Sequence, residues 1–65
     1  MRVKFGNHID LCRRITLSEG SSILIITTMN GVYTVDCGAN DVAVALYAQM
    51  LVYGYIDVSG YKWSN

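Results

Sequence analysis

Two β-rich runs joined by Asn30-Gly31 constrain the fold of this chain more than any other feature. Residues 23–29 and residues 32–37 are both rich in Ile, Val, Thr and Tyr, which favour strands. An Asn-Gly pair between two such runs is typical of a two-residue hairpin turn, because both turn residues must tolerate a positive φ angle. The predicted cross-strand pairs are Met29 with Val32, Thr28 with Tyr33, Ile26 with Val35 and Leu24 with Cys37.

The two-residue period of a strand divides this hairpin into two faces. One face is apolar throughout and is predicted to meet the core. It carries Leu24, Ile26, Val35 and Cys37. The other face is half apolar, which is more than a solvated sheet face needs. It carries Ile23, Ile25, Thr27, Val32, Thr34 and Asp36.

The N-terminal segment predicts a second hairpin, for which two registers are open. Residues 2–5 alternate between charged and apolar side chains, and Gly6-Asn7-His8 contains turn-forming residues. A two-residue loop pairs Phe5 with His8, whereas a three-residue loop pairs Phe5 with Ile9. The three-residue loop keeps the apolar side chains on one face and sets opposite charges across from each other, so it is the register that we predict.

Arg13 interrupts the alternation of the next predicted strand, residues 9–17. A β-bulge at this position would turn both Arg13 and Arg14 outward. The alternative is an inward Arg13 that binds a carboxylate or another anion. The bulge is the predicted arrangement, and the polar residues 18–22 are predicted to form the following loop.

A helix is predicted over residues 42–53. Asn40 is a favourable N-cap, and Gly54 is a typical residue for the left-handed position that ends a helix. Beyond the helix, Ile56 and Val58 alternate with polar residues and predict a short last strand.

These elements predict an α+β fold. It consists of a small antiparallel β-meander of about four strands, one α-helix packed across it and a short C-terminal strand. With 65 residues, the chain is expected to form a single small domain, residues 1–65.

The predicted helix lacks a polar side. No charged residue occurs between residues 42 and 56, whereas a surface helix normally carries charges on the side away from the core. Since one sheet cannot cover both sides, one stripe is predicted to pack on the sheet and the other on a second copy of the chain. The predicted sheet-facing stripe carries Val44, Tyr47, Ala48, Leu51 and Tyr55. The predicted homodimer interface carries Val42, Leu46, Gln49, Met50 and Tyr53.

A different protein is the alternative occupant of the second stripe. A membrane is disfavoured, because the run is shorter than the roughly 20 residues of a membrane-spanning helix. The run also lacks the basic residues of a helix that lies in the membrane interface. We therefore predict no association with membranes.

The charge of the chain bears on which partners it can bind, and its cysteines bear on its location in the cell. Five basic and five acidic residues leave no net charge, whereas nucleic-acid-binding domains are usually basic. The charges are unevenly placed, with four basic residues against one acidic in the first fourteen positions and one against four in the rest. Binding to nucleic acid is therefore disfavoured. Two cysteines without an apolar leader segment favour reduced thiols and a cytoplasmic location.

No residue pattern indicates catalysis or a cofactor. His8 is the only histidine, and its spacing from Cys12 and Cys37 matches no zinc motif. A cysteine nucleophile would need His8 as its base, and the five carboxylates form no pair typical of general acid–base catalysis. We therefore expect no enzyme activity, no metal and no cofactor.

Three functions remain open at this point. The predicted one is a small non-enzymatic protein-interaction module, homodimeric, acting as an inhibitor or adaptor of the kind that phages and other mobile elements encode. The alternatives are a small-ligand binder, with a pocket lined by tyrosine and tryptophan at the dimer interface, and a weak nucleic-acid binder that uses the basic first hairpin. Candidate residues for a ligand or partner surface are Arg13, Arg14, Tyr55, Tyr61 and Trp63, since large amphipathic rings and guanidinium groups are favoured in binding surfaces.

Overall fold

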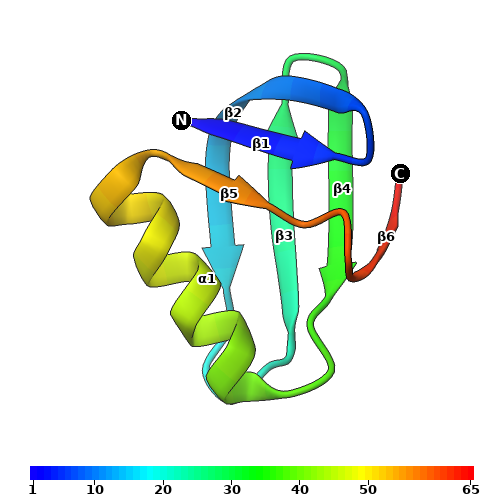
Figure 1. Ribbon diagram of the computed structural model, residues 1–65. Coiled ribbons are helices and arrows are strands. Elements are labelled where there is room, and N and C mark those ends of the chain that lie inside the picture. Colours follow the sequence, from blue (N-terminus) through cyan, green and yellow to red (C-terminus); the bar gives the residue numbers. More distant parts are fainter.

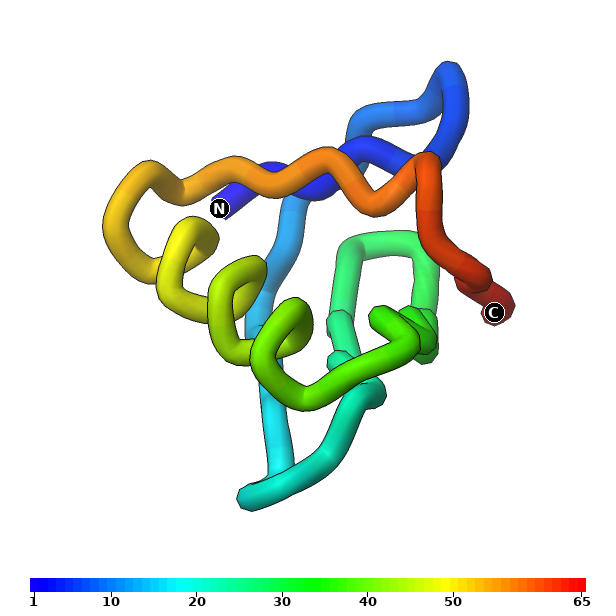
Figure 2. The backbone as a smooth tube through the Cα atoms, turned by 60° about the horizontal axis from the view of Figure 1, so that its bottom comes forward, coloured from blue at the N-terminus to red at the C-terminus, as the bar shows by residue number.

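A computed structural model describes all 65 residues, which form a curled six-stranded sheet and one helix (Figure 1). The elements are β1 (Arg2–Phe5), β2 (His8–Leu17), β3 (Ile23–Thr28), β4 (Gly31–Asp36), α1 (Asn40–Tyr53), β5 (Tyr55–Asp57) and β6 (Lys62–Ser64). The strand order is β5-β1-β2-β3-β4-β6, and every pair is antiparallel except β1 with β5. β1 and β5 cross over one end of the other strands, and α1 runs along one side of the curl (Figures 1 and 2).

The α+β class and the helix packed on a mostly antiparallel sheet are confirmed, but the strand count is higher than predicted. The predicted last strand is β5, whose Ile56 is fully buried and pairs with Val3. The additional strand is β6, an edge strand of three residues that pairs with β4 and that the sequence does not predict. Such a short strand carries too few residues for a period of two to be recognised.

The β3–β4 hairpin forms, but its predicted register is wrong by two residues. Ile26 pairs with Tyr33, not with Val35, and Thr28 pairs with Gly31. The turn therefore consists of Met29 and Asn30. A two-residue shift leaves every side chain on its predicted face. Leu24, Ile26, Val35 and Cys37 are accordingly buried, as predicted.

Backbone angles explain this register. A turn at Asn30-Gly31 would need positive φ at both residues, but no residue other than glycine has positive φ in this structure. Of these two residues only Gly31 has a positive φ, 134°. The Thr28 hydroxyl closes the turn, because it accepts the N–H of Asn30 at 3.0 Å and donates to the carbonyl of Gly31 at 3.1 Å.

The β1–β2 hairpin adopts the two-residue loop at Gly6-Asn7, so the preferred three-residue loop is wrong. Phe5 pairs with His8 and Val3 pairs with Asp10. Gly6 supplies the positive φ, 59°, that the tighter turn requires. As a consequence Ile9 faces outward, while the Asp10 side chain points to the buried side.

The predicted bulge in β2 is confirmed. The register between β2 and β3 shifts between Cys12 and Arg14, and Arg13 and Arg14 are both exposed. The inward alternative for Arg13 is therefore excluded. The bulge also bends β2, which takes part in both halves of the curled sheet.

The helix begins two residues earlier than predicted and ends where predicted. Ala39, not Asn40, occupies the N-cap, and it makes no capping side-chain bond. The amide of Asn40 instead donates to the carbonyl of Ser21 at 2.8 Å and ties the helix start to the β2–β3 loop. Gly54 ends the helix with φ of 71°, and its N–H donates to the carbonyl of Met50.

The helix packs on the sheet mainly through the stripe opposite to the predicted one, although Tyr47 of the predicted stripe is partly buried against the core. Ala43, Leu46 and Met50 are buried in the core, whereas Val44 and Leu51 are exposed. A helix that is apolar all round carries no pattern that selects the buried side. The core comprises Val3, Phe5, Cys12, Ile15, Leu24, Ile26, Val35, Cys37, Ala43, Leu46, Met50, Ile56 and Val58.

Gly31→Val is expected to destabilise the fold by roughly 1–3 kcal/mol, the cost of a strained backbone position. The reason is its positive φ, and a Cβ atom there would also lie 3.1 Å from the Asn65 side chain. Urea unfolding followed by Trp63 fluorescence measures the difference. Gly60→Ala is the control, since Gly60 lacks a positive φ and a Cβ atom at this position would meet no other atom within 4 Å. Equal midpoints for both variants would contradict the assigned turn.

Candidate functional site

The side of α1 that faces away from the sheet is an uncovered apolar stripe. Val44, Leu51 and Val52 have 48%, 60% and 72% of their surface exposed, and the small side chains of Ala45 and Ala48 lie between them. Ala48 is the centre of this stripe, because the other four lie three or four positions from it and therefore on the same side. We call these five residues the helix stripe.

The predicted dimer-interface residues do not lie together on this stripe. Leu46 and Met50 belong to the core, so the prediction that they face a second copy is wrong. Val42 is partly buried beside them. Gln49 is exposed, and its amide donates to the carbonyl of Tyr55 at 3.4 Å. Tyr53 is also exposed, with 78% of its surface accessible. Homodimer formation itself stays a prediction.

A second apolar surface lies on the outer face of β2, β3 and β4. Its aliphatic members are Ile23, Ile25 and Val32, with exposed fractions of 42%, 40% and 52%. Cross-strand pairing places Thr16, Ile25, Thr34 and Ser64 in one row, and Arg14, Thr27 and Val32 in the next. We call this surface, which lies on the side of the sheet opposite to α1, the outer sheet face.

Two arginines border the outer sheet face. Arg13 and Arg14 are exposed at the bulge of β2, and Arg14 shares a row with Thr27 and Val32. Neither makes an ion pair, since the only salt bridge in the structure joins His8 and Asp10. The guanidinium groups are therefore available to carboxylates of a binding partner.

The aromatic members of the predicted partner surface are separated from these arginines. Tyr55 lies on β5 under the guanidinium of Arg2, 5.6 Å from the ring centre. Tyr61 is partly buried against the core. Trp63 belongs to an aromatic cluster that links β1, β4 and β6. Ring centres in that cluster are 4.3 Å apart for Phe5 and Tyr33, and 5.2 Å apart for Phe5 and Trp63.

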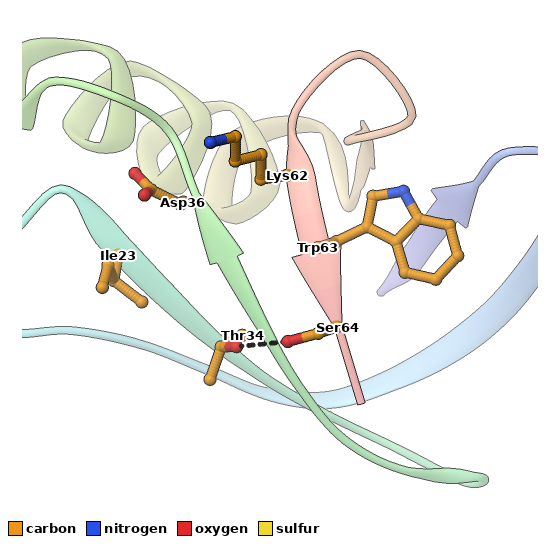
Figure 3. A pocket seen from close by; sticks show the side chains of 6 residues that line it. All are labelled: Ile23, Thr34, Asp36, Lys62, Trp63 and Ser64. Carbon is orange, nitrogen blue, oxygen red and sulfur yellow. Dashed lines mark hydrogen bonds between the residues drawn. The ribbon is translucent and has the colours of Figure 1, made fainter.

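Two open hollows flank β6, one of 180 Å³ and one of 310 Å³. The smaller is closed along one side by a contact of 3.2 Å between the hydroxyls of Thr34 and Ser64 (Figure 3). Its lining residues are Ile23, Thr34, Asp36, Lys62, Trp63 and Ser64. The larger is lined by Asp36, Cys37, Gly38, Gly60, Tyr61 and Lys62. Each is lined by a single aromatic side chain, Trp63 in the smaller and Tyr61 in the larger, and the predicted pocket at a dimer interface stays a prediction.

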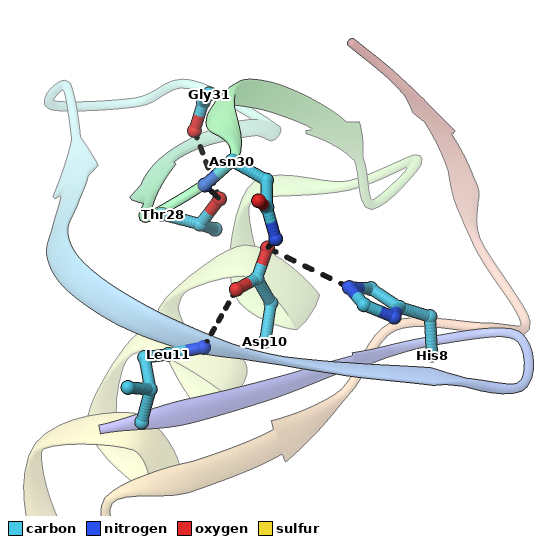
Figure 4. A network of polar contacts seen from close by, with 6 residues as sticks. All are labelled: His8, Asp10, Leu11, Thr28, Asn30 and Gly31. Carbon is cyan, nitrogen blue, oxygen red and sulfur yellow. Dashed lines mark hydrogen bonds and ion pairs between the residues drawn. The ribbon is translucent and has the colours of Figure 1, made fainter.

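A polar cluster around Asp10 connects the tips of the two hairpins (Figure 4). The Asp10 carboxylate accepts the amide of Asn30 at 3.0 Å and the N–H of Leu11 at 2.9 Å. The Nε2 atom of His8 lies 3.7 Å from the same carboxylate. This cluster does not follow from the predicted three-residue loop, because only the two-residue loop at Gly6-Asn7 turns Asp10 inward.

The cluster favours the ionised form of Asp10. Burial acts to raise the pKa of this carboxyl, but the hydrogen bond from the Asn30 amide, the nearby Thr28 hydroxyl, the hydrogen bond from the Leu11 N–H and the charge of His8 together outweigh burial and lower the pKa below its ordinary value of 3.8. The same holds for Asp57, whose pKa is lowered by the hydroxyl and N–H of Ser59. A lowered pKa in the folded state means that ionisation of the carboxyl stabilises the fold.

The cysteines are poorly suited to nucleophilic chemistry. Both thiols are free and buried. Burial raises the pKa of Cys12 and of Cys37, and the charge of Asp36 adds to the effect at Cys37. A raised pKa keeps a thiol protonated, and the thiolate is the reactive form. Three or more His, Cys, Asp or Glu side chains come together nowhere in the structure.

Comparison with known protein families, with curated proteins and with solved structures finds no match for this chain. The one helix, α1, does not reach the length and hydrophobicity of a helix that crosses a membrane.

Asp10→Asn is expected to flatten the dependence of stability on pH. Wild-type stability should be complete above about pH 4 and should fall as the pH drops through the lowered pKa values of Asp10 and Asp57. The variant lacks the first of these carboxylates, so it should lose less stability between pH 5 and pH 2. Urea unfolding at several pH values measures the slope, and Asn30→Ala should weaken it as well. The same slope in wild type and Asp10→Asn would contradict a stabilising Asp10 carboxylate.

Proposed function

We propose that this chain is a small non-enzymatic protein-interaction module that binds a partner protein through its outer sheet face. By covering part of that partner it would act as an inhibitor or adaptor. The observation that carries the proposal is the half-exposed set of Ile23, Ile25 and Val32 on paired strands, with nothing packed over it.

The apolar part of this face supplies binding free energy. Burying a whole aliphatic side chain contributes about 1.5–3 kcal/mol. Ile23, Ile25 and Val32 each retain roughly half of their surface, so covering them contributes on the order of 3 kcal/mol. The threonines between them, Thr27 and Thr34, favour the strand conformation and offer hydroxyls to a partner. These features suit an extended protein surface better than a small molecule, for which a concave pocket is the usual site.

The charged border favours an acidic partner. Arg13 and Arg14 extend from the bulge beside the apolar rows and have no ion-pair partner within the chain. Carboxylates of a partner would form charge-assisted hydrogen bonds with them, and the association rate would then depend on salt. The proposed partner is thus a protein surface with apolar residues flanked by Asp or Glu.

A cytoplasmic location is part of the proposal. It is supported by the two free cysteines, since unpaired thiols are typical of proteins in reducing compartments.

Ile25→Glu is expected to abolish capture of the partner from an extract of the host cell. The substitution places a charge at the centre of the outer sheet face, while the exposed position of Ile25 allows the chain to stay folded, as circular dichroism would verify. Leu51→Glu, on the opposite side of the molecule, is the matched control and should capture the same protein. Arg13→Glu combined with Arg14→Glu should weaken capture.

Other outcomes would contradict the proposal. If the captured material disappears after nuclease treatment, and if its affinity for the chain falls steeply as the salt concentration rises, the partner is a nucleic acid instead. A melting temperature that rises with the concentration of a small molecule would indicate a ligand binder. Equal capture by wild type and Ile25→Glu would exclude the outer sheet face.

A further inference from the structure

We infer that the helix stripe is the contact surface of a symmetric homodimer, in which α1 packs antiparallel against α1 of a second copy about a two-fold axis at Ala48. The stripe lies on the opposite side of the sheet from the proposed partner surface, so neither proposal depends on the other. The occupant is a second copy because the stripe is complementary to itself in shape and in charge.

Small and large side chains lie at matching distances on either side of Ala48. Val44 and Ala45 precede it by four and three positions, and Leu51 and Val52 follow it by three and four. Rotation by 180° about an axis at Ala48 therefore sets Leu51 of one copy opposite the small Ala45 of the other, and Val52 opposite Val44. The small residues at the centre allow the two helices to approach closely, toward the lower end of the usual 8–10 Å between helix axes.

The charges at the two ends of the stripe are opposite. Asp41 lies two helical turns before Ala48, about 10 Å along the axis, in the first turn of α1. Arg2 lies at the other end, because its N–H donates to the carbonyl of Gly54 at 2.7 Å and its guanidinium lies over Tyr55. Figure 1 shows the start of β1 beside the end of α1.

Neither of these charges is paired within the chain. The only ion pair is that of His8 and Asp10, and Asp41 accepts only the N–H of Val42 among its side-chain hydrogen bonds. In the antiparallel arrangement Asp41 faces Arg2 of the partner subunit, and the two-fold axis repeats this contact at the other end. A parallel arrangement would place like charges together. Self-complementarity of this kind is what a two-fold interface requires.

The small area of the stripe indicates a weak dimer. A 14-residue helix is about 21 Å long, and a width of about 11 Å, the diameter of a helix with its side chains, gives a footprint of roughly 230 Å² on each copy. The sum of about 460 Å² is below the 1,200–2,000 Å² of standard stable interfaces. We therefore expect a dimer that exchanges with monomer, with a dissociation constant in the micromolar to high-micromolar range.

Sedimentation equilibrium between 5 and 500 µM tests the surface. Wild type is expected to shift from monomer toward dimer across this range. Leu51→Glu should remain monomeric and folded, since Leu51 is exposed in the monomer. Val32→Glu, an equally polar change on the outer sheet face, should dimerise like wild type. A wild type that is monomeric at 500 µM would overturn the inference, and so would a dimer that is abolished by Val32→Glu but not by Leu51→Glu.

Charge reversal tests the antiparallel arrangement. Asp41→Lys and Arg2→Glu should each weaken the dimer about tenfold, because each change makes two like-charged contacts across the axis. The double variant Asp41→Lys/Arg2→Glu should return the dissociation constant to within about threefold of wild type, because the opposite charges again face each other. A double variant no tighter than the weaker single variant would overturn the proposed contact.

Disulfide trapping tests the position of the axis. Ala48→Cys should oxidise to a covalent dimer, since a disulfide requires Cβ atoms about 3.5–4.5 Å apart. Asp41→Cys and Val32→Cys should not cross-link to themselves, and wild type controls for the two buried cysteines. Efficient self-cross-linking of Asp41→Cys, with none at Ala48→Cys, would exclude the antiparallel dimer.

Discussion

The backbone ladder that joins β1 to β5 determines how the helix is oriented. Val3 is paired on both edges of its strand, with Asp10 of β2 and with Ile56 of β5. β5 begins directly after Gly54, so the end of α1 is held next to β1 and the helix has little freedom to rotate about its axis. Because of this ladder, Ala43, Leu46 and Met50 enter the core and the helix stripe remains outside.

The polar cluster at Asp10 shows how one tight turn changes the role of distant residues. The two-residue loop at Gly6-Asn7 turns Asp10 toward the buried side, where a carboxylate without partners would be costly. Asn30 supplies its amide to Asp10 and therefore acts through its side chain and not through a positive φ. The tips of both hairpins are thereby joined at one end of the curled sheet (Figure 4).

The small core also explains why two apolar surfaces remain uncovered. One curled sheet and one helix bury their inner faces against each other, and nothing in the chain is left to cover the outer sheet face or the helix stripe. Contiguous apolar patches larger than a few hundred Å² are rare on isolated monomers and are typical of contact surfaces. The charges beside the two surfaces differ. Two arginines border the outer sheet face, whereas the helix stripe has an acidic residue at one end and a basic residue at the other.

The sequence by itself determined the α+β class, the core face of the β3–β4 hairpin, the bulge at Arg13 and the stop at Gly54. These depend on local rules, namely the two-residue period of a strand and the conformational freedom of glycine. Only the tertiary structure decided both hairpin registers, the capping of α1, the existence of β6 and which side of α1 is buried. Each of these depends on contacts between segments distant in sequence. For a helix apolar on all sides, the contacts at its two ends select the buried face, namely the pairing of β5 with β1 and the bond from Asn40 to Ser21.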